Sequence, residues 1–203
     1  MTIKLYHCAG ARSLRPLWTL EEMGLAYELE VMAFPPRFLR DGYTDINPIG
    51  TVPFMTDGDV QMTESVAICQ YLADVYGAGE LTVKITEPEY GEYLNWMHRS
   101  DATLTFPQTL VLRYTMLEPD ESLKKVVDDY SRWFFSRLRA LEKALKGRDY
   151  LCTNRFTLAD ICVSFALYLA DAALGLREGF GPETQRYYEF MQQRPALQRA
   201  LAK

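Results

Sequence analysis

NPIGTVPFMTDGDVQMTESVAICQYLAD, residues 47–74, is the stretch of sequence that decides the fold. Its order predicts a loop, a strand, a tight turn, a second strand and a helix. Val52-Pro53 opens the first strand, because proline lacks an N–H and biases its predecessor toward an extended backbone. Asp57-Gly58-Asp59 is typical of a turn between two strands. A helix is expected after Thr63-Glu64-Ser65, because apolar residues then recur at helical spacing.

Two kinds of recognition group converge on this stretch. The backbone N–H and C=O of Val52 could pair with an extended peptide in the manner of an added strand. Glu64 and Ser65 place a carboxylate and a hydroxyl beside the free N–H groups of a helix start, which suits an amine and a carboxylate together. A small zwitterionic peptide would satisfy both groups. The alternative is that Val52-Pro53 is an ordinary turn and that Thr63 or Ser65 is an ordinary N-cap.

The residues that precede this stretch predict a strand, a helix and a second strand. Residues 2–7 alternate apolar and polar side chains, and Cys8 to Ala11 is a turn of small residues. Ser13 is a candidate cap for a helix that Gly24 would end. Tyr27 to Val31 then predicts the next strand, so the two strands should pair in parallel through a right-handed crossover. Residues 34–46 are expected to form an irregular loop.

Beyond Gly77 the sequence changes to long helical periods without strand patterns. Thr157 and Asp160 form a variant of the capping box at the start of a buried helix, with Phe156 placed as a hydrophobic staple. This constellation is predicted to be structural. The helices expected in this half are Glu89 to about Thr105, Glu121 to Lys146, Thr157 to Leu174, Pro182 to Gln193 and Pro195 to Ala202.

Composition and charge exclude several classes of protein. A formal net charge of −5 gives no basic footprint for nucleic acid or an anionic membrane. The longest apolar stretch, Ile161 to Leu176, is interrupted by Asp171 and is too short to span a bilayer, and no signal peptide is evident. Four cysteines without a C-x-x-C pair indicate reduced thiols in a cytoplasmic protein. Two distant histidines give no metal-ligand spacing, so no metal is expected.

Several motifs occur in an order that resembles the cytosolic glutathione S-transferase family. They are Tyr6 on the first strand, the turn that contains Ser13, LEEMGLAYE, NPIGTVP, TES before a helix, and Phe156 to Asp160 in the second half. The resemblance covers essentially the whole chain. It implies an α/β thioredoxin-like domain over residues 1–78 that binds glutathione as co-substrate. A linker over 79–88, an all-α helical bundle over 89–203 that shapes the second-substrate pocket, and a homodimer are implied as well.

The chemistry implied by the resemblance is activation of the glutathione thiol. Lowering a thiol pKa of about 8.5 by two units requires about 2.7 kcal/mol of preference for the thiolate. A helix N-terminus and a hydroxyl donor together supply this amount. Ser13 is the first candidate hydroxyl, as the second serine of an S-R-S pattern in which Ala11 replaces the first. Arg12, acting as a cation or through its backbone N–H, is the second candidate, and Tyr6 or Cys8 follow.

The remaining site residues are implied by the same resemblance. Glu64 and Ser65 would hold the γ-glutamyl end, Val52 would pair with the cysteinyl unit, and Pro53 would be a cis proline. Thr51 stands where many members carry a basic residue for the glycine carboxylate. Arg40 or Arg37 would substitute for that basic residue. Asp101 stands where a partner-subunit acid reaches the γ-glutamyl amine, and a solvated helix acid is the alternative for it.

Three functions remain open from the sequence. The first is a transferase that adds glutathione to small hydrophobic electrophiles, with peroxide or disulfide reduction as a further activity. The second is a non-catalytic module that binds glutathione or a partner protein, which the missing hydroxyl at Ala11 favours. The third is a glutathione-dependent isomerase or ether lyase, which would share the whole site and differ only in the helical pocket.

Overall fold

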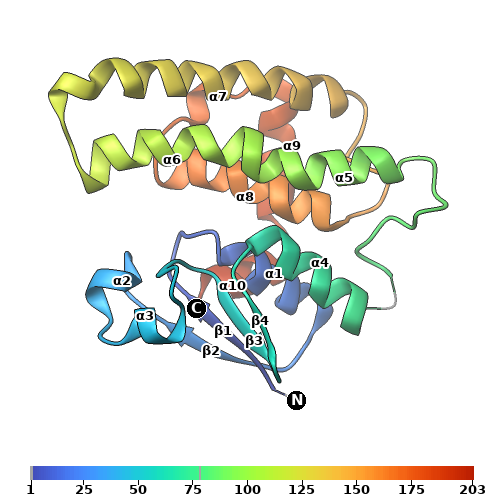
Figure 1. Ribbon diagram of the computed structural model, residues 1–203. Helices are drawn as coiled ribbons and strands as arrows, with labels where there is room; N and C mark the ends of the chain where they lie inside the picture. The colour runs from blue at the N-terminus through green and yellow to red at the C-terminus, as the bar shows by residue number, and fades with distance from the viewer. Residues whose placement is uncertain (1, 78) are drawn as a thin grey trace. The chain divides into compact units, whose positions relative to one another are not determined.

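The computed structural model describes residues 2–77 and 79–203. The chain divides into two compact units, one made of Met1–Thr82 with Gln193–Lys203 and the other of Val83–Gln192 (Figure 1). The first unit is α/β and thioredoxin-like, and the second is entirely helical, so both expected architectures are confirmed. The expected boundary at residue 78 lies outside the described residues.

A four-stranded sheet with the order β2-β1-β3-β4 forms the centre of the first unit. The strands are β1 (Ile3–His7), β2 (Tyr27–Val31), β3 (Phe54–Asp57) and β4 (Val60–Met62). β1 pairs with β2 in parallel, as the strand–helix–strand pattern predicted, and pairs with β3 antiparallel. The β3–β4 hairpin turns at Gly58, whose φ of +58° suits a residue without a Cβ. The expected pattern of strands is therefore confirmed.

Three helices pack beside this sheet: α1 (Leu14–Met23), α4 (Ser65–Tyr76) and α10 (Pro195–Leu201) (Figure 1). α1 buries one face through residues such as Leu17 and Leu20, and it ends at Gly24 in the left-handed conformation that glycine favours. α4 begins at Ser65, as the sequence predicted. The helices therefore cover the sheet through the apolar periodicity of the sequence.

The final segment joins the sheet unit, whereas the sequence placed it with the helical bundle. Arg194 binds Glu22 of α1 through two hydrogen bonds of 2.7 and 2.9 Å. Arg199 binds Glu21 at 2.7 Å, and Leu197 is buried. These contacts connect residues more than 170 positions apart in sequence, so local patterns carry no information about them.

Residues 34–46 contain two one-turn helices, α2 (Pro36–Leu39) and α3 (Tyr43–Ile46), instead of the expected irregular loop. Pro36 occupies the first position of α2, where its missing N–H costs least. Tyr43 is buried and its ring centroid lies 6.0 Å from that of Tyr6 on β1. Packing on the sheet therefore stabilises these short turns, which would not persist alone.

The helical unit contains α5 (Tyr90–Arg99), α6 (Phe106–Leu112), α7 (Lys124–Ala144), α8 (Leu158–Ala172) and α9 (Pro182–Gln192). Figure 1 shows α7 alongside the continuous rod made of α5 and α6. No helix among the described residues is long and apolar enough to cross a membrane.

The rod departs from the single helix expected between Glu89 and Thr105, because π-helical turns occupy Ser100–Thr105 and Arg113–Leu117. Pro107 has no N–H to donate within the helix, and the N–H of Phe106 bonds the carbonyl of Asp101, five residues back. The rod therefore continues past Thr105 instead of ending there.

The start of α8 confirms the capping box. The side chains of Thr157 and Asp160 each accept a hydrogen bond from the other residue's backbone N–H. The buried Asp160 carboxylate also accepts from the Leu151 N–H at 3.0 Å and from the Tyr187 hydroxyl at 2.9 Å. Asp160 is therefore a structural residue that joins the α8 start to a loop and to α9.

Candidate functional site

The hydroxyl of Ser13, the first expected activator, is bonded inside the turn between β1 and α1. Its side chain is 0% exposed, and Oγ lies 2.8 Å from Nδ1 of the buried His7. The backbone N–H of Cys8 donates to the same oxygen at 3.2 Å. Ser13 is the N-cap residue of α1, but its side chain makes no capping bond to that helix. In this structure the hydroxyl therefore holds the turn together.

His7 stays neutral at physiological pH because of its surroundings. Burial lowers its pKa to about 4, and the contact with Ser13 only partly opposes this effect. A neutral ring accepts or donates a hydrogen bond without bringing a charge into the core. His7 and Ser13 therefore form a buried neutral pair, and His7, the last residue of β1, was not among the residues predicted from the sequence.

The tip of the same turn carries Ala11 and Arg12, both of which are half-buried. Gly10 takes a φ of +70°, which lets the chain reverse, and the Ala11 N–H bonds the Cys8 carbonyl at 3.1 Å. Ala11 presents a methyl group without a hydroxyl, and it packs against a cluster that includes Val52. The structure therefore brings the α1 start and the Val52 edge together.

Tyr6 and Cys8, the other expected activators, belong to this buried cluster, whose members are Tyr6, Cys8, Tyr43, Val52 and Phe54. The Tyr6 ring centroid lies 5.6 Å from that of Phe54. Burial raises the pKa of the Cys8 thiol to about 11, and its Sγ lies 3.6 Å from the Ala33 carbonyl. A thiol in this environment is a poor nucleophile. Both residues therefore contribute to the core.

The loop before β3 is held so that Val52 presents its backbone. The peptide bond between Val52 and Pro53 is cis. The Tyr43 hydroxyl and the Asn47 side-chain amide donate to the Thr51 carbonyl at 2.7 and 2.8 Å. Among the described residues no hydrogen bond is made by the main-chain N–H or C=O of Val52. The expected pairing of Val52 with an extended ligand requires an unpaired main chain of this kind.

A buried arginine reaches the start of α4. The Arg15 side chain is 0% exposed, and Nη1 donates to Ser65 Oγ at 3.0 Å. Ser65 is itself buried, and Glu64 precedes it in an extended conformation as the N-cap residue. A buried guanidinium favours a nearby anion, so a carboxylate at this helix start would meet both the helix dipole and Arg15. The Glu64 side chain supplies the opposite charge for an amine.

Arg15 was not among the site residues predicted from the sequence, although its position on the helix indicates a buried contact. It is the one cation between Leu14 and Leu17 on the face of the helix that the apolar residues bury. A charged residue at such a position is rarely buried without a partner. This position alone could have suggested a functional or structural contact for Arg15.

The two arginines considered for the glycine carboxylate differ in availability. Arg40 Nε lies 2.6 Å from Glu30, and Lys4 bonds the same carboxylate at 2.9 Å. Arg37 is exposed and forms no ion pair among the described residues. A Cβ added at Gly50 would lie 2.9 Å from Arg37 Cβ, so Arg37 lies against the loop that leads to Thr51. Arg37 is therefore the better placed of the two.

Asp101 belongs to the helical unit, on the π-helical turn Ser100–Thr105, and is half-buried. The structure thus places it on a different unit from the other candidate residues. Across residues 2–77 and 79–203, no group of three or more histidine, cysteine or acidic side chains could hold a metal ion. The start of α1 lies near Val52 through Ala11. It is also connected, through Arg15, to Ser65 and the adjoining Glu64.

Comparisons with known proteins identify the same two parts. Residues 1–74 match the family model described as "Glutathione S-transferase, N-terminal domain", and residues 108–195 match the model for the C-terminal domain. A wheat (Triticum aestivum) glutathione S-transferase is 31% identical over 182 residues, which covers 88% of this chain and 82% of the relative. Glutathione S-transferase GstA of Escherichia coli O157:H7 is 29% identical over 210 residues, with 98% of each chain covered.

A solved structure agrees with the fold. The glutathione transferase URE2P8 of Phanerochaete chrysosporium, crystallised with oxidised glutathione, superposes with a TM-score of 0.86 at 20% identity. The match covers 99% of this chain and 94% of that one.

Proposed function

The chain belongs to the glutathione S-transferase family, and from this premise we propose that it activates the glutathione thiol for attack on small hydrophobic electrophiles. The observation that carries this proposal is the buried Arg15–Ser65 contact at the start of α4. Glu64 and Ser65 would hold the amino-acid head of glutathione, while Arg15 fixes the Ser65 hydroxyl. Val52, next to the cis Pro53, would pair with the cysteinyl unit. The URE2P8 structure with oxidised glutathione supports glutathione as the co-substrate.

In this proposal the first turn of α1 stabilises the thiolate. The bond between the Ser13 hydroxyl and His7, together with the lack of a hydroxyl at Ala11, supports an activator other than a serine side chain. A helix N-terminus supplies about 1 to 2 kcal/mol in a sheltered geometry, and the Arg12 guanidinium adds a cation. The thiol pKa would therefore fall by one to two units. We assign activation to Arg12 and the α1 backbone, and a structural role in the turn to Ser13.

Arg37 is assigned to the glycine carboxylate, because Arg40 is bonded to Glu30. Residue Thr51 offers a hydroxyl at the same end. Asp101 is proposed to act in a second subunit, on the γ-glutamyl amine. The sheet unit would then bind glutathione, and the helical unit would shape the pocket for the electrophile.

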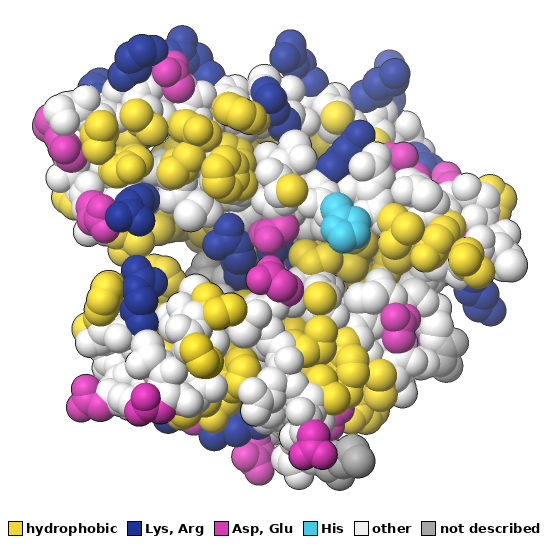
Figure 2. Space-filling model, viewed as in Figure 1, with side chains coloured by type: hydrophobic (Ala, Val, Ile, Leu, Met, Phe, Trp, Pro, Cys, Tyr) yellow, Lys and Arg dark blue, Asp and Glu magenta, His cyan; other side chains and the backbone are white. Residues whose placement is uncertain are grey.

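A homodimer and a cytoplasmic location complete the proposal. Figure 2 shows hydrophobic side chains gathered over α6 and α7 on one face of the helical unit. The exposed large ones on these segments and the turns beside them are Phe106, Met116, Leu117 and Trp133. An apolar surface of this kind suits a contact with a second copy. The four cysteines are buried thiols that form no disulfide, as expected in a reducing compartment.

The experiment that tests the proposal measures the thiolate directly. The ultraviolet absorbance of glutathione bound to the protein is followed from pH 5 to 9, and turnover is measured with a chloronitrobenzene substrate. We expect a thiolate midpoint below the value of about 8.5 for a free thiol. Arg12→Gln should raise this midpoint, and Arg132→Gln, which removes a charge from the exposed α7 surface, should not. A bound thiol that titrates like free glutathione would contradict the transferase.

A non-catalytic glutathione-binding module is the second candidate, and Ala11 together with the buried Ser13 favours it. Such a module would bind glutathione calorimetrically but show neither a lowered thiol pKa nor turnover. An isomerase, an ether lyase, a peroxidase or a disulfide reductase would share the lowered pKa. A panel of maleyl compounds, aryl ethers, peroxides and disulfides separates these activities from electrophile conjugation.

A further inference from the structure

Two buried side chains, one on α3 and one at its C-terminal end, hold a single carbonyl group beside Val52. The Tyr43 hydroxyl and the Asn47 side-chain amide donate to the Thr51 carbonyl at 2.7 and 2.8 Å. Tyr43 and Asn47 are each 1% exposed. A carbonyl oxygen has two lone pairs, so these two donors satisfy it. The direction of the Thr51 carbonyl is therefore set from the α3 side.

The direction of this carbonyl also sets the direction of the Val52 N–H. Both groups belong to the peptide unit between Thr51 and Val52, which is planar and trans. In a trans unit the C=O and the N–H point to opposite sides, so donors that hold the carbonyl toward α3 turn the N–H away from α3. This N–H is one of the two main-chain groups of Val52 that would pair with the cysteinyl unit. Tyr43 and Asn47 therefore act on that pairing through one rigid plane.

The two donors differ in what else they hold. Asn47 also builds the loop, because its Oδ1 accepts from the Ile49 N–H at 3.2 Å and its carbonyl accepts from the Gly50 N–H at 2.8 Å. The Tyr43 side chain combines the bond to Thr51 with a ring that packs in the core. Burial raises the pKa of the Tyr43 hydroxyl above its usual value of 10, so the hydroxyl stays protonated and remains a donor. Loss of this hydroxyl alone would release the carbonyl without dismantling the loop.

The Tyr43 ring is fixed by the sheet. Its centroid lies 6.0 Å from that of Tyr6, and the Tyr6 centroid lies 5.6 Å from that of Phe54. Tyr6 and Phe54 are partners across the β1–β3 pair, and Val52 belongs to the same buried cluster. A donor supported by packed rings is already in position before a ligand arrives, which reduces the entropy lost on binding.

We propose that Tyr43 is a positioning residue for glutathione: its hydroxyl holds the Thr51–Val52 peptide plane, and the Val52 N–H is thereby presented to the cysteinyl carbonyl. This inference rests on the function proposed above. The pairing at Val52 serves the bound substrate and the transition state alike, so its loss weakens binding and leaves the chemical step little changed. Thiol activation is assigned to the start of α1, so a defect at Val52 should separate KM from kcat.

The test compares Tyr43→Phe, which keeps the ring, with the unmodified full-length protein. Calorimetry should show a Kd for glutathione that is raised about fivefold, the effect expected for one neutral hydrogen bond. KM for glutathione should rise by the same factor, while kcat with a chloronitrobenzene substrate should change by less than about twofold. At saturating glutathione, nuclear magnetic resonance should show faster hydrogen exchange of the Val52 amide in Tyr43→Phe. A purely structural role predicts no such local difference at equal occupancy.

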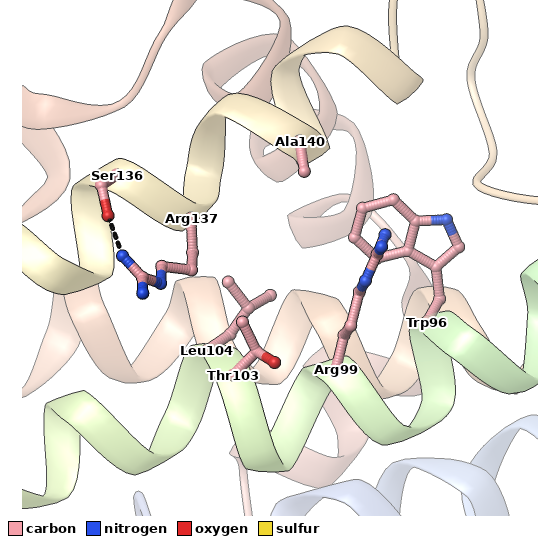
Figure 3. A pocket seen from close by; sticks show the side chains of 7 residues that line it. All are labelled: Trp96, Arg99, Thr103, Leu104, Ser136, Arg137 and Ala140. Atoms are coloured by element: carbon pink, nitrogen blue, oxygen red, sulfur yellow. Dashed lines mark hydrogen bonds between the residues drawn. The ribbon is translucent and has the colours of Figure 1, made fainter.

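Two variants are matched controls. Tyr27→Phe makes the same side-chain change on the same sheet, where the Tyr27 hydroxyl donates to Glu21 at 2.5 Å. Ser136→Ala removes a hydroxyl that, like that of Tyr43, donates to a main-chain carbonyl at 2.7 Å. Ser136 lines a hollow within the helical unit, shown in Figure 3. Both controls should keep the glutathione Kd and the Val52 exchange rate of the unmodified protein.

Asn47→Asp examines the same peptide plane from the second donor, because it keeps an acceptor for the Ile49 N–H and removes the donor to Thr51. It should also raise the Kd for glutathione, and it replaces Tyr43→Phe if urea unfolding shows that this variant is not folded. An unchanged Kd, an equal rise in Tyr27→Phe, or a fall in kcat at constant KM would overturn the inference alone. Absence of glutathione binding by the unmodified protein would overturn the proposed function with it.

Discussion

Arg15 and Ser65 are 50 residues apart in sequence, and the guanidinium of the first donates a hydrogen bond of 3.0 Å to the hydroxyl of the second. Both side chains are buried. The contact joins α1 to the start of α4, and so connects the turn expected to activate the thiol with the residues expected to hold the amino-acid head. The strength of glutathione binding should therefore depend on a residue of α1.

Arg15→Ala should lower the free energy of unfolding by about 3 kcal/mol, since it removes one partner of a buried charged contact. Arg15→Lys should retain more stability but raise KM for glutathione by about tenfold, because lysine cannot reproduce the planar donor fork. Urea unfolding and steady-state kinetics measure these effects. A lysine variant with unchanged KM would show that Arg15 only fills space.

Ser13→Ala should destabilise the protein by about 1–3 kcal/mol, because the buried Cys8 N–H and the His7 ring lose a hydrogen-bond partner. Turnover per folded molecule should remain near that of the unmodified protein. Chemical unfolding and kinetics at a temperature where both proteins are folded measure the two quantities. Lost turnover at retained stability would instead assign the thiol to the Ser13 hydroxyl.

His7 should make the protein less stable in acid. Its folded pKa is about 4, below the usual 6.5, so the unfolded chain binds more protons between these values. The stabilisation is therefore fully present above pH 6.5 and is lost as the pH falls through 4. The loss amounts to about 3 kcal/mol. Urea midpoints measured from pH 4 to 7 should show this slope, and His7→Gln should flatten it. An equal slope in His7→Gln would assign the acid sensitivity to other groups.

Arg194→Ala should loosen α10 from α1. The Arg194–Glu22 pair is largely shielded from solvent, with side chains 26% and 11% exposed, so its loss should cost about 1 kcal/mol. Hydrogen exchange in residues 195–201 should accelerate, while exchange in α8 should not change. Arg132→Ala, which breaks an exposed pair in α7, should have no measurable effect on either quantity. Unchanged exchange in Arg194→Ala would indicate that apolar packing alone holds α10.

The sequence by itself determined the elements that depend on neighbouring residues. The β3–β4 turn at Gly58, the end of α1 at Gly24 and the Thr157–Asp160 capping box each require particular side chains within a few positions, and each was predicted. Parallel pairing of β1 and β2 followed from the strand–helix–strand order. These features are fixed by backbone geometry and local hydrogen bonding.

Only the tertiary structure decided which partner each polar side chain found. The Ser13 hydroxyl turns inward because the His7 ring lies 2.8 Å away, and Arg15 meets Ser65 across the packed helices α1 and α4. The position of α10 also depends on the tertiary structure, because Arg194 next to it binds Glu22 of α1. Sequence periodicity predicts that a residue is buried. The free energy of burying a polar side chain, however, depends on partners that only folding brings close to it. The direction of each of these side chains therefore required the fold.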